Sequence, residues 1–509
     1  MAPTAHSVRI PGRMVGRVRR RDFNRSETMI RRRLITVMTV GLVMATSLPA
    51  AERITRDQAR VALRKAVGFF RNTVSADGGY LWRYSHDLAR REGEGRANRG
   101  TSWVQPSGTP TVGEGLLEAW LTCGETVLRD AAVHAGHHLA GGQLLSGGWD
   151  YRIETDPALR KAYAYRLGGN PRGRNRTTLD DNTTQSALRF LMHLDRALDY
   201  RDATIHSAVE FSLASLIKAQ FPNGAWSQRY SEFPDPAKFP VRKAGYPRSW
   251  SRVFPKKRYY TFYTFNDNSI ADVVRTMIEA SEIYGNRRCR AAAEKAGDFI
   301  LLAQMPDPQP AWAQQYDLEM HPAWARKFEP PSVTGGESQG VMHTLIFLYL
   351  KTGRQEFLDA VPRALEYLRK SEIGPGKLAR FYELKTNRPL YFTRQYKLVY
   401  TDDDLPTHYG FQVNSNLNAV EAAWRRAKQS GPAKPVDRKA LPPRKKTRLT
   451  ATIEGRALAA IKAMDGRGAW VEQGKLKYHG DDDPTTKIIT TTTFVRHVTA
   501  LAVYLAADR

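Results

Sequence analysis

Apolar residues recur every three or four positions through much of the chain, which is the spacing of one face of an α-helix. The pattern is clearest in residues 54–72, 183–198, 269–285 and 338–353. Segments that alternate apolar and polar residues, as half-buried strands do, are hard to find. The pattern therefore predicts an all-α protein.

A turn that ends in tryptophan returns between the predicted helices. These turns end at Trp82, Trp149, Trp226, Trp312 and Trp470. The last interval is about two periods long, and residues 373–384 occupy the missing place, with Ala379 and Arg380 where Ala-Trp is expected. Helical hairpins of this kind bury their apolar faces only against one another. The repeat predicts an α/α toroid, either a six-unit barrel or an incomplete ring, in which the tryptophans are packing elements.

Repeat and composition together divide the chain into four parts. Residues 1–51 are expected to be an N-terminal extension with a signal peptide, and residues 52–428 the toroid. Residues 429–450 combine prolines with basic side chains and show little apolar periodicity, which is typical of a solvated linker. Residues 451–509 are expected to form a last helical pair that packs on the toroid.

The N-terminal part has the order of a secretory signal. Arg31, Arg32 and Arg33 precede an apolar run over residues 34–47, and small residues follow. The run is shorter than the roughly 20 apolar residues that span a bilayer. We expect an exported protein, periplasmic or secreted, with no stable membrane span in the mature chain.

The net charge of +27 suggests an anionic partner. Residues 1–50 hold ten arginines and two carboxylates, so the remaining chain is still strongly basic. The linker lacks interleaved aromatic residues, and a nucleic-acid partner is therefore not expected. Cys123 and Cys289 show no metal or CxxC spacing, which argues against zinc and thiol chemistry and favours two buried thiols.

Two clusters of hard oxygen donors each stand directly before a predicted helix. The first is Asp180, Asp181 and Asn182, and the second spans residues 266–268 around Asp267. Either cluster alone is explained as a helix N-cap. If successive hairpins bring both to the same end of the toroid, they would suit a cation such as calcium, which takes six to eight oxygen ligands.

Two further segments carry candidate cations. Arg326 and Glu329 stand among prolines and glycines in the sequence ARKFEPPS. Residues 389–411 supply Arg394 and Lys397, followed by an acidic run at residues 402–404 to which we assign no role.

Residues 140–411 resemble the family 10 polysaccharide lyases, or pectic acid lyases. The similar segments include LSGGW, TLDDNTTQSALRFL, TFNDNSI, ARKFEPPS and ARFYELKTNRPLYF, in family order. The resemblance implies an α/α toroid that cleaves an acidic polysaccharide such as polygalacturonate by β-elimination with Ca²⁺, and we expect it to act as a monomer. It implies Arg326 as the catalytic base, the metal ligands Asp180, Asp267 and Asp181, and the substrate-binding residues Arg394, Arg380, Asp180 and Lys397.

The implied reaction removes the weakly acidic C5 proton of a uronate and expels the O4-linked sugar. The enzyme must neutralise the uronate carboxylate as negative charge develops. An arginine base is unusual, because the pKa of its side chain lies above 12 in solution. It becomes workable when nearby cations disfavour the protonated guanidinium.

The chain departs from the family in two places. The family usually has an Arg-Arg pair where this chain has Pro406 to Phe411, so that His408 stands near the place of an expected arginine. An Arg/Lys-rich insertion over residues 238–260 is expected to form a lid or to replace the missing cation.

Two other functions compete with the lyase. A non-catalytic uronide-binding protein of the same fold would keep the cleft without turnover. A different toroid enzyme such as a terpenoid cyclase is suggested by the QxxxGxW elements at Trp149 and Trp226 and by the acidic run at residues 402–404.

Overall fold

The computed structural model describes residues 53–256, 258–434, 438–441 and 447–508. The predicted N-terminal extension and signal peptide, residues 1–51, lie outside the described residues, as does part of the linker. Over the described ranges, no helix combines the length and the apolar character needed to cross a bilayer.

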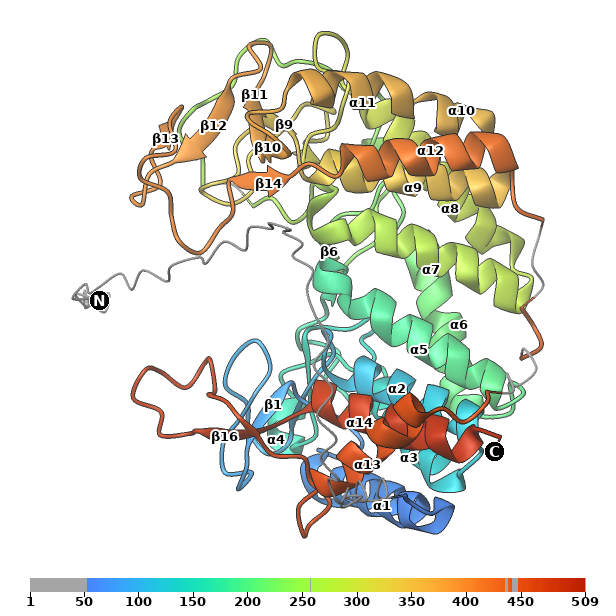
Figure 1. Ribbon diagram of the computed structural model, residues 1–509. Helices are drawn as coiled ribbons and strands as arrows, with labels where there is room; N and C mark the ends of the chain where they lie inside the picture. The colour runs from blue at the N-terminus through green and yellow to red at the C-terminus, as the bar shows by residue number, and fades with distance from the viewer. Residues whose placement is uncertain (1–52, 257, 435–437, 442–446, 509) are drawn as a thin grey trace, which may run out of the picture. The chain divides into compact units, whose positions relative to one another are not determined.

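Six helices form an inner row in which each contacts the next, in the order α14, α2, α5, α7, α9 and α12. Figure 1 shows α5, α7, α9 and α12 side by side. Their bounds are α2 (Thr109–Cys123), α5 (Thr183–Ala197), α7 (Ser269–Tyr284), α9 (Glu337–Thr352), α12 (Leu417–Ser430) and α14 (Thr491–Ala506).

Outer helices pack against this row. Helix α1 contacts α14, α3 contacts α2, α6 contacts α5, α8 contacts α7, α10 and α11 contact α9, and α13 contacts α14. Their bounds are α1 (Arg56–Phe69), α3 (Thr126–Gly141), α6 (Ala203–Lys218), α8 (Arg287–Ala303), α10 (Gln355–Asp359), α11 (Val361–Lys370) and α13 (Ala451–Lys462). Paired inner and outer helices are the architecture of an α/α toroid, and this prediction is confirmed.

Four of the repeated tryptophans fill the same place in their hairpins. Trp149, Trp226, Trp312 and Trp470 are buried. Each indole N–H donates a hydrogen bond of 2.8 Å to a carbonyl oxygen of the preceding outer helix. Their interpretation as packing elements is confirmed.

The other two members of the repeat were assigned to the wrong residues. In five turns a glycine with positive φ stands two positions before a buried side chain; these glycines are Gly78, Gly147, Gly224, Gly376 and Gly468. In the two misassigned turns, the buried residue two positions after the glycine is Tyr80 in the first and Leu378 in the second. Trp82 is only half-buried, and Arg380 lies two residues beyond Leu378. The hairpin needs a glycine turn and an apolar plug, and tryptophan is one of several side chains that serve.

Short strands connect neighbouring hairpins. The strand before each inner helix pairs antiparallel with a strand that contains or follows one of the buried plugs. The pairs are β3 (Thr101–Trp103) with β4 (Arg152–Glu154), β5 (Thr177–Thr178) with β6 (Arg229–Tyr230), β7 (Tyr263–Thr264) with β8 (Gln315–Tyr316), β9 (Ser332–Thr334) with β11 (Phe381–Glu383), β14 (Gln412–Asn414) with β10 (Lys377–Ala379), and β16 (Lys487–Thr490) with β1 (Arg83–Ser85). This pairing gathers the turns that precede the inner helices at one end of the row. The strands β12 (Pro389–Phe392) and β13 (Leu398–Val399) extend the sheet from β11.

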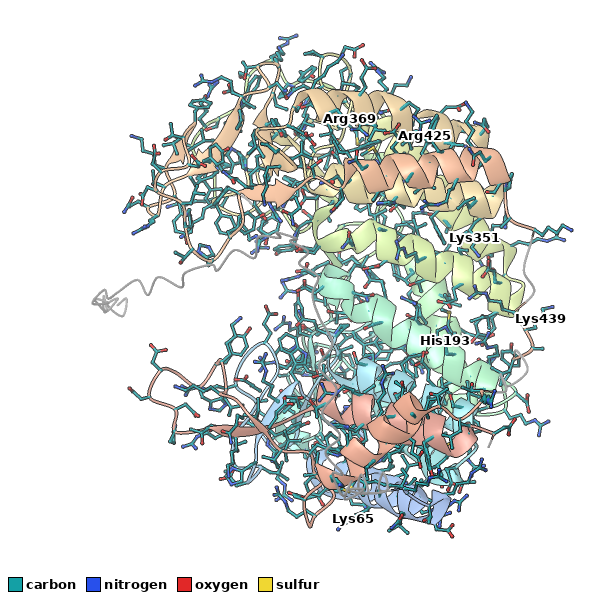
Figure 2. The ribbon with its side chains drawn as sticks, viewed as in Figure 1. Lys65, His193, Lys351, Arg369, Arg425 and Lys439 are labelled. Atoms are coloured by element: carbon teal, nitrogen blue, oxygen red, sulfur yellow. The ribbon has the colours of Figure 1, made fainter. Side chains whose placement is uncertain are left out.

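The linker after α12 crosses the other end of the row. The Ala433 amide donates to the Leu350 carbonyl of α9, and the Arg438 amide donates to Glu282 of α7. The Lys439 carbonyl accepts from Tyr200, just beyond α5, and Figure 2 labels Lys439 at this place. These bonds tie the described part of residues 429–450 to the inner helices, while most of its described residues are exposed.

Candidate active site

Two turns of the same conformation precede α5 and α7. They are the 3-10 turns η2 (Asp180–Asn182) and η4 (Asn266–Asn268), and the two turns contact each other. The middle residues, Asp181 and Asp267, have φ of 49° and 48°, and the asparagines that follow are also left-handed. Aspartate and asparagine tolerate this region better than most residues. The repeat makes Asp181, rather than Asp180, the counterpart of Asp267.

The turns bring three carboxylates together. Asp180, Asp181 and Asp267 each offer an oxygen within 4.8 Å of the others. Burial, followed by the charge of Asp180, raises the pKa of Asp181 to about 7 and that of Asp267 to about 6. We name these three residues the acidic cluster; all three predicted metal ligands lie in it.

Other oxygen atoms around the acidic cluster have no hydrogen-bond partner among the described residues. They are Oδ1 of Asp180, Asn182 and Asn266, and all are buried. A buried polar atom without a partner is costly, and a bound ion satisfies it. Carboxylate and amide oxygens in this number fit calcium.

Hydrogen bonds from two neighbouring hairpins fix the position of the acidic cluster. Asp180 Oδ2 accepts from the Tyr151 hydroxyl at 2.6 Å and from the Arg229 guanidinium at 3.1 Å. Asp181 Oδ2 accepts from the Gln105 side-chain amide at 2.9 Å. Sequence reasoning missed these three supporting residues, although Tyr151 and Arg229 each stand two or three positions after a repeated tryptophan, on or beside β4 and β6.

Arg326 lies in a tight loop with Glu329. The Glu329 carboxylate is 2% exposed and accepts from the Arg326 backbone amide, from Nε at 2.9 Å and from a terminal nitrogen at 2.5 Å. Burial works against the charge on each group. The ion pair nevertheless raises the pKa of Arg326 and lowers that of Glu329. The loop thus holds a charged guanidinium, and a base at this position has to leave Glu329 first.

Tyr409 links Arg326 to Arg380. Its hydroxyl donates to Glu329 Oε1 at 2.9 Å and accepts from Arg380 at 2.8 Å. Its ring lies 5.4 Å from the Arg326 guanidinium and 4.6 Å from that of Arg380. Arg380 also approaches Glu337, the first residue of α9, at 3.6 Å. The two arginines form one network through an aromatic side chain that the sequence noted only as part of a departure.

Arg394 and Lys397 lie apart from this network. Both belong to the loop between β12 and β13, where Arg394 is 67% exposed and pairs with Asp404 at 3.1 Å. Lys397 is exposed, and its backbone closes the loop on Thr393. The loop reaches the Arg326 segment through Tyr396, whose ring stacks on Phe328 at 5.7 Å.

The two departures from the family pattern have different surroundings. His408 packs edge-on against Phe328 at 5.4 Å, so an aromatic contact occupies the place near the expected arginine. In the insertion, Arg252 pairs with Glu383 at 2.5 Å, and the Ser251 carbonyl accepts from Trp324 at 2.9 Å. The insertion is anchored beside the Arg326 loop by these contacts.

Comparison with known families identifies the central part of the chain. Residues 143–375 match the family model described as pectic acid lyase. This segment is similar to the pectic acid lyases. It contains the acidic cluster and Arg326, whereas Arg380 and Arg394 lie beyond it. The prediction of a polysaccharide lyase is confirmed at this level. No curated protein sequence matches the chain.

The chain is also similar to solved structures of carbohydrate-active enzymes. A family 10 polysaccharide lyase from Cellvibrio cellulosa is 20% identical, with 62% of this chain and 95% of that chain covered and a TM-score of 0.43. A mutant of it in complex with trigalacturonic acid is 19% identical, with 63% and 98% covered and the same TM-score. A GH76 α-mannanase from Bacteroides thetaiotaomicron is 8% identical, with 88% and 95% covered and a TM-score of 0.38. These scores are low, and the fold assignment rests on the helix contacts.

Proposed function

We propose that the protein is a calcium-dependent pectate lyase that cleaves polygalacturonate or a related polyuronide by β-elimination. The acidic cluster carries the proposal, because three carboxylates within 4.8 Å lie beside unpaired buried oxygens. The family match supports the reaction class. The substrate class draws support from the basic charge of the chain and from the trigalacturonic acid bound to the similar Cellvibrio lyase.

Asp180, Asp181 and Asp267 would hold the calcium ion. When bound, the ion supplies positive charge that neutralises the uronate carboxylate, acidifies its C5 proton and disfavours the protonated form of Arg326. The chain's own residues orient the carboxylates through Tyr151, Arg229 and Gln105. Arg380 is the second guanidinium available to a substrate carboxylate.

Arg326 is the proposed base. Once the guanidinium has released one proton to water, Arg326 takes the C5 proton. The C5 electron pair then forms the C4–C5 double bond, the C4–O4 bond breaks, and the leaving oxygen takes a proton from water. Glu329 and Tyr409 hold the guanidinium in position before reaction. The carboxylate of Glu329 stabilises the charged form of the Arg326 guanidinium. The guanidinium therefore leaves Glu329 as it becomes the base.

A non-catalytic uronide-binding protein is the second candidate. The ion pair with Glu329 favours it, because a permanently charged Arg326 binds carboxylates and does not accept protons. The terpenoid cyclase has less support. In the acidic run, Asp402 accepts from Gln412 and Asp404 pairs with Arg394, both near the surface.

The test follows the unsaturated uronate product by its ultraviolet absorbance, with polygalacturonate and calcium. We expect wild-type activity that chelation abolishes and that Arg326→Ala lowers by about a thousandfold. Arg129→Ala removes an equal charge from a surface pair on α3 and should leave activity unchanged. Binding without product would favour the uronide-binding protein, and neither binding nor product would refute both.

Export, the monomeric state and the four-part division of the chain remain predictions. Export rests on residues 1–51, which lie outside the described residues. Measuring the mass of the mature protein and its partition between cells and medium would test the first two.

A further inference from the structure

A cavity of about 680 Å³ lies next to the acidic cluster, on the far side of Arg229. Its walls come from the end of α6, the segment after Trp226 and the last residues of the insertion. The residues that matter for its chemistry are Arg176, Phe221, Arg229, Tyr230, Arg258 and Tyr260.

Two of its cations are available to an anionic ligand. Arg229 is paired with Asp180 at 3.1 Å, and Lys238 with Asp235 at 3.6 Å. Within the described ranges, Arg176 and Arg258 form no ion pair, and Glu232 is the one other carboxylate that lines the cavity. The cavity therefore has positive charge to offer, in the bidentate form that suits a carboxylate.

Aromatic rings supply the rest of the wall. The Arg176 guanidinium lies 5.6 Å from the Tyr260 ring, and Phe221 packs edge-to-face on Phe239 at 4.8 Å. Tyr230 and Phe233 lie 6.3 Å apart. Pyranose rings present C–H groups that pack on aromatic faces. A sugar that also carries a carboxylate fits both features of the cavity.

The cavity and the acidic cluster share a wall. The Arg229 side chain reaches Asp180, while its backbone amide donates to the Tyr260 carbonyl at 3.2 Å. The preceding residue, Tyr259, is half-buried, and the charges that act most strongly on its hydroxyl are those of Arg326 and Glu329. Successive residues at the end of the insertion thus border the reaction site and the cavity.

We propose that this cavity is a second binding site for an anionic sugar unit of the polyuronide chain whose cleavage takes place at the acidic cluster. The inference rests on the proposed function and extends it to the length of the substrate. Arg258 comes from the insertion, so the insertion adds a cation on this side of the site, while His408 and aromatic rings occupy the place of the expected arginine on the other.

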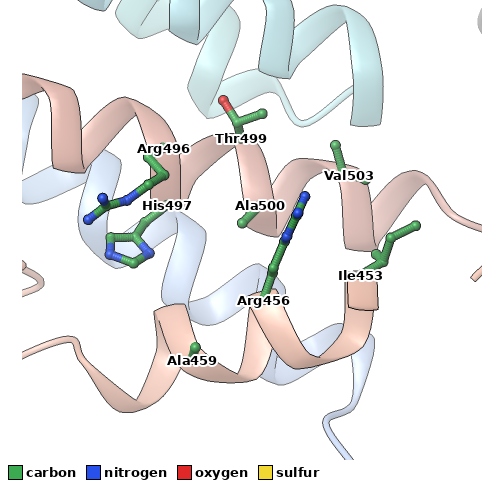
Figure 3. Close-up of a pocket in the computed structure, with 8 residues that line it drawn as sticks. All are labelled: Ile453, Arg456, Ala459, Arg496, His497, Thr499, Ala500 and Val503. Atoms are coloured by element: carbon green, nitrogen blue, oxygen red, sulfur yellow. The ribbon is translucent and has the colours of Figure 1, made fainter. Parts of the chain in front are cut away.

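Another cavity, a groove of about 600 Å³ between α13 and α14, is lined by Arg456, Arg496 and His497 together with mostly apolar residues (Figure 3). Nothing among the described residues shows what would cover it, and it carries no proposal.

The test compares the double variant Arg176→Ala/Arg258→Ala with Arg248→Ala in the full chain with calcium. Arg248 lies exposed in the same insertion and does not line the cavity. We expect the double variant to raise KM for polygalacturonate about tenfold with kcat unchanged. On the shortest oligogalacturonate that the enzyme accepts, the double variant should have the same kcat and KM as the wild type. Arg248→Ala should match the wild type on both substrates.

An unchanged KM for the polymer would overturn the proposal. So would an equal loss on polymer and short oligomer, since the arginines would then act on the cleaved unit or on the fold. If the wild type cleaves no polyuronide, the lyase function is refuted. Calorimetric titration of the variants with polygalacturonate then tests whether the cavity binds the polymer. The double variant must then bind about tenfold more weakly than Arg248→Ala.

Discussion

The inner helices α2, α5 and α7 carry charge in two places, and only one of them is fully balanced by cations. At their amino ends, the acidic cluster gathers three carboxylates whose mutual repulsion adds to the cost of burial. Further along the same helices, His193 of α5 lies between Glu114 of α2 and Glu279 of α7, at 2.7 and 2.8 Å (Figure 2). We name these three residues the histidine bridge.

The histidine bridge is balanced by further cations. Arg189 contacts Glu279 at 3.0 Å, and Arg438 of the linker approaches it at 3.5 Å. Burial alone favours a neutral ring, but the two carboxylates raise the pKa of His193 to about 9. Buried charge that is balanced by partners joins helices. The excess negative charge that remains in the acidic cluster after Asp180 pairs with Arg229 marks a place for a cation.

Removing one carboxylate of the acidic cluster has the largest expected effect. Asp267→Asn should lower lyase activity at least about a hundredfold, because it removes a ligand of the proposed ion. Without calcium the same variant should gain about 1 kcal/mol of unfolding free energy, because a repelled charge is gone. Activity assays and denaturant unfolding in chelator measure both. A variant that loses stability along with activity would assign Asp267 a structural role.

The histidine bridge should respond in the opposite way. His193→Ala should lower the free energy of unfolding by about 2 kcal/mol, because it leaves Glu114 and Glu279 without their shared partner. The kcat of the folded protein should not change. His137→Ala is the matched control, since His137 is 46% exposed in its pair with Asp202 and should cost less than about 1 kcal/mol. A kcat loss in His193→Ala would link the two charged regions.

The two regions should lose stability in different pH windows. Asp181 and Asp267 bind protons more tightly when folded, so without calcium stability falls as pH rises from about 4 to 7. His193 also has a raised pKa, and its contribution is complete below about 6.5 and lost as pH rises through about 9. Calcium should abolish the first fall and His193→Gln the second. Unfolding curves across this range would contradict the account if calcium changed only the alkaline fall.

The smallest expected effect concerns the arginine network. Tyr409→Phe keeps the ring between Arg326 and Arg380 but removes the hydroxyl that joins Glu329 to Arg380. We expect kcat/KM to fall about fivefold, in keeping with the loss of hydrogen bonds worth about 1 kcal/mol. Tyr396→Phe, with only a long contact of 3.4 Å to His408, should change nothing measurable. Equal effects of the two substitutions would argue against a positioning role for Tyr409.

The helices and most of the repeat could be predicted because both depend on local sequence. Apolar spacing marks the inner helices. Gly-x-Trp turns mark three of the buried plugs, and a Pro-Ala-Trp turn marks Trp312. Tyr80 and Leu378 escaped prediction because any large apolar side chain fills that place. The strands escaped because most have only two or three residues, too few to show alternation.

The candidate site was predicted in part. Asp180, Asp181, Asp267 and Arg326 were found because they stand in recognisable segments. Their partners were missed because Tyr151, Arg229 and Tyr409 come from other hairpins, which only strand pairing brings near. The expected role of Arg394 in gripping substrate stays a prediction, and its pairing with Asp404, beyond β13, depends on how the hairpin folds.

A calcium titration of the purified full chain tests the central claim most directly. Calorimetry should show about one ion bound per chain, and the double variant Asp181→Asn/Asp267→Asn should lose that binding while remaining folded. If the double variant bound calcium as the wild type does, the acidic cluster would not be the metal site, and the proposed mechanism would fail with it.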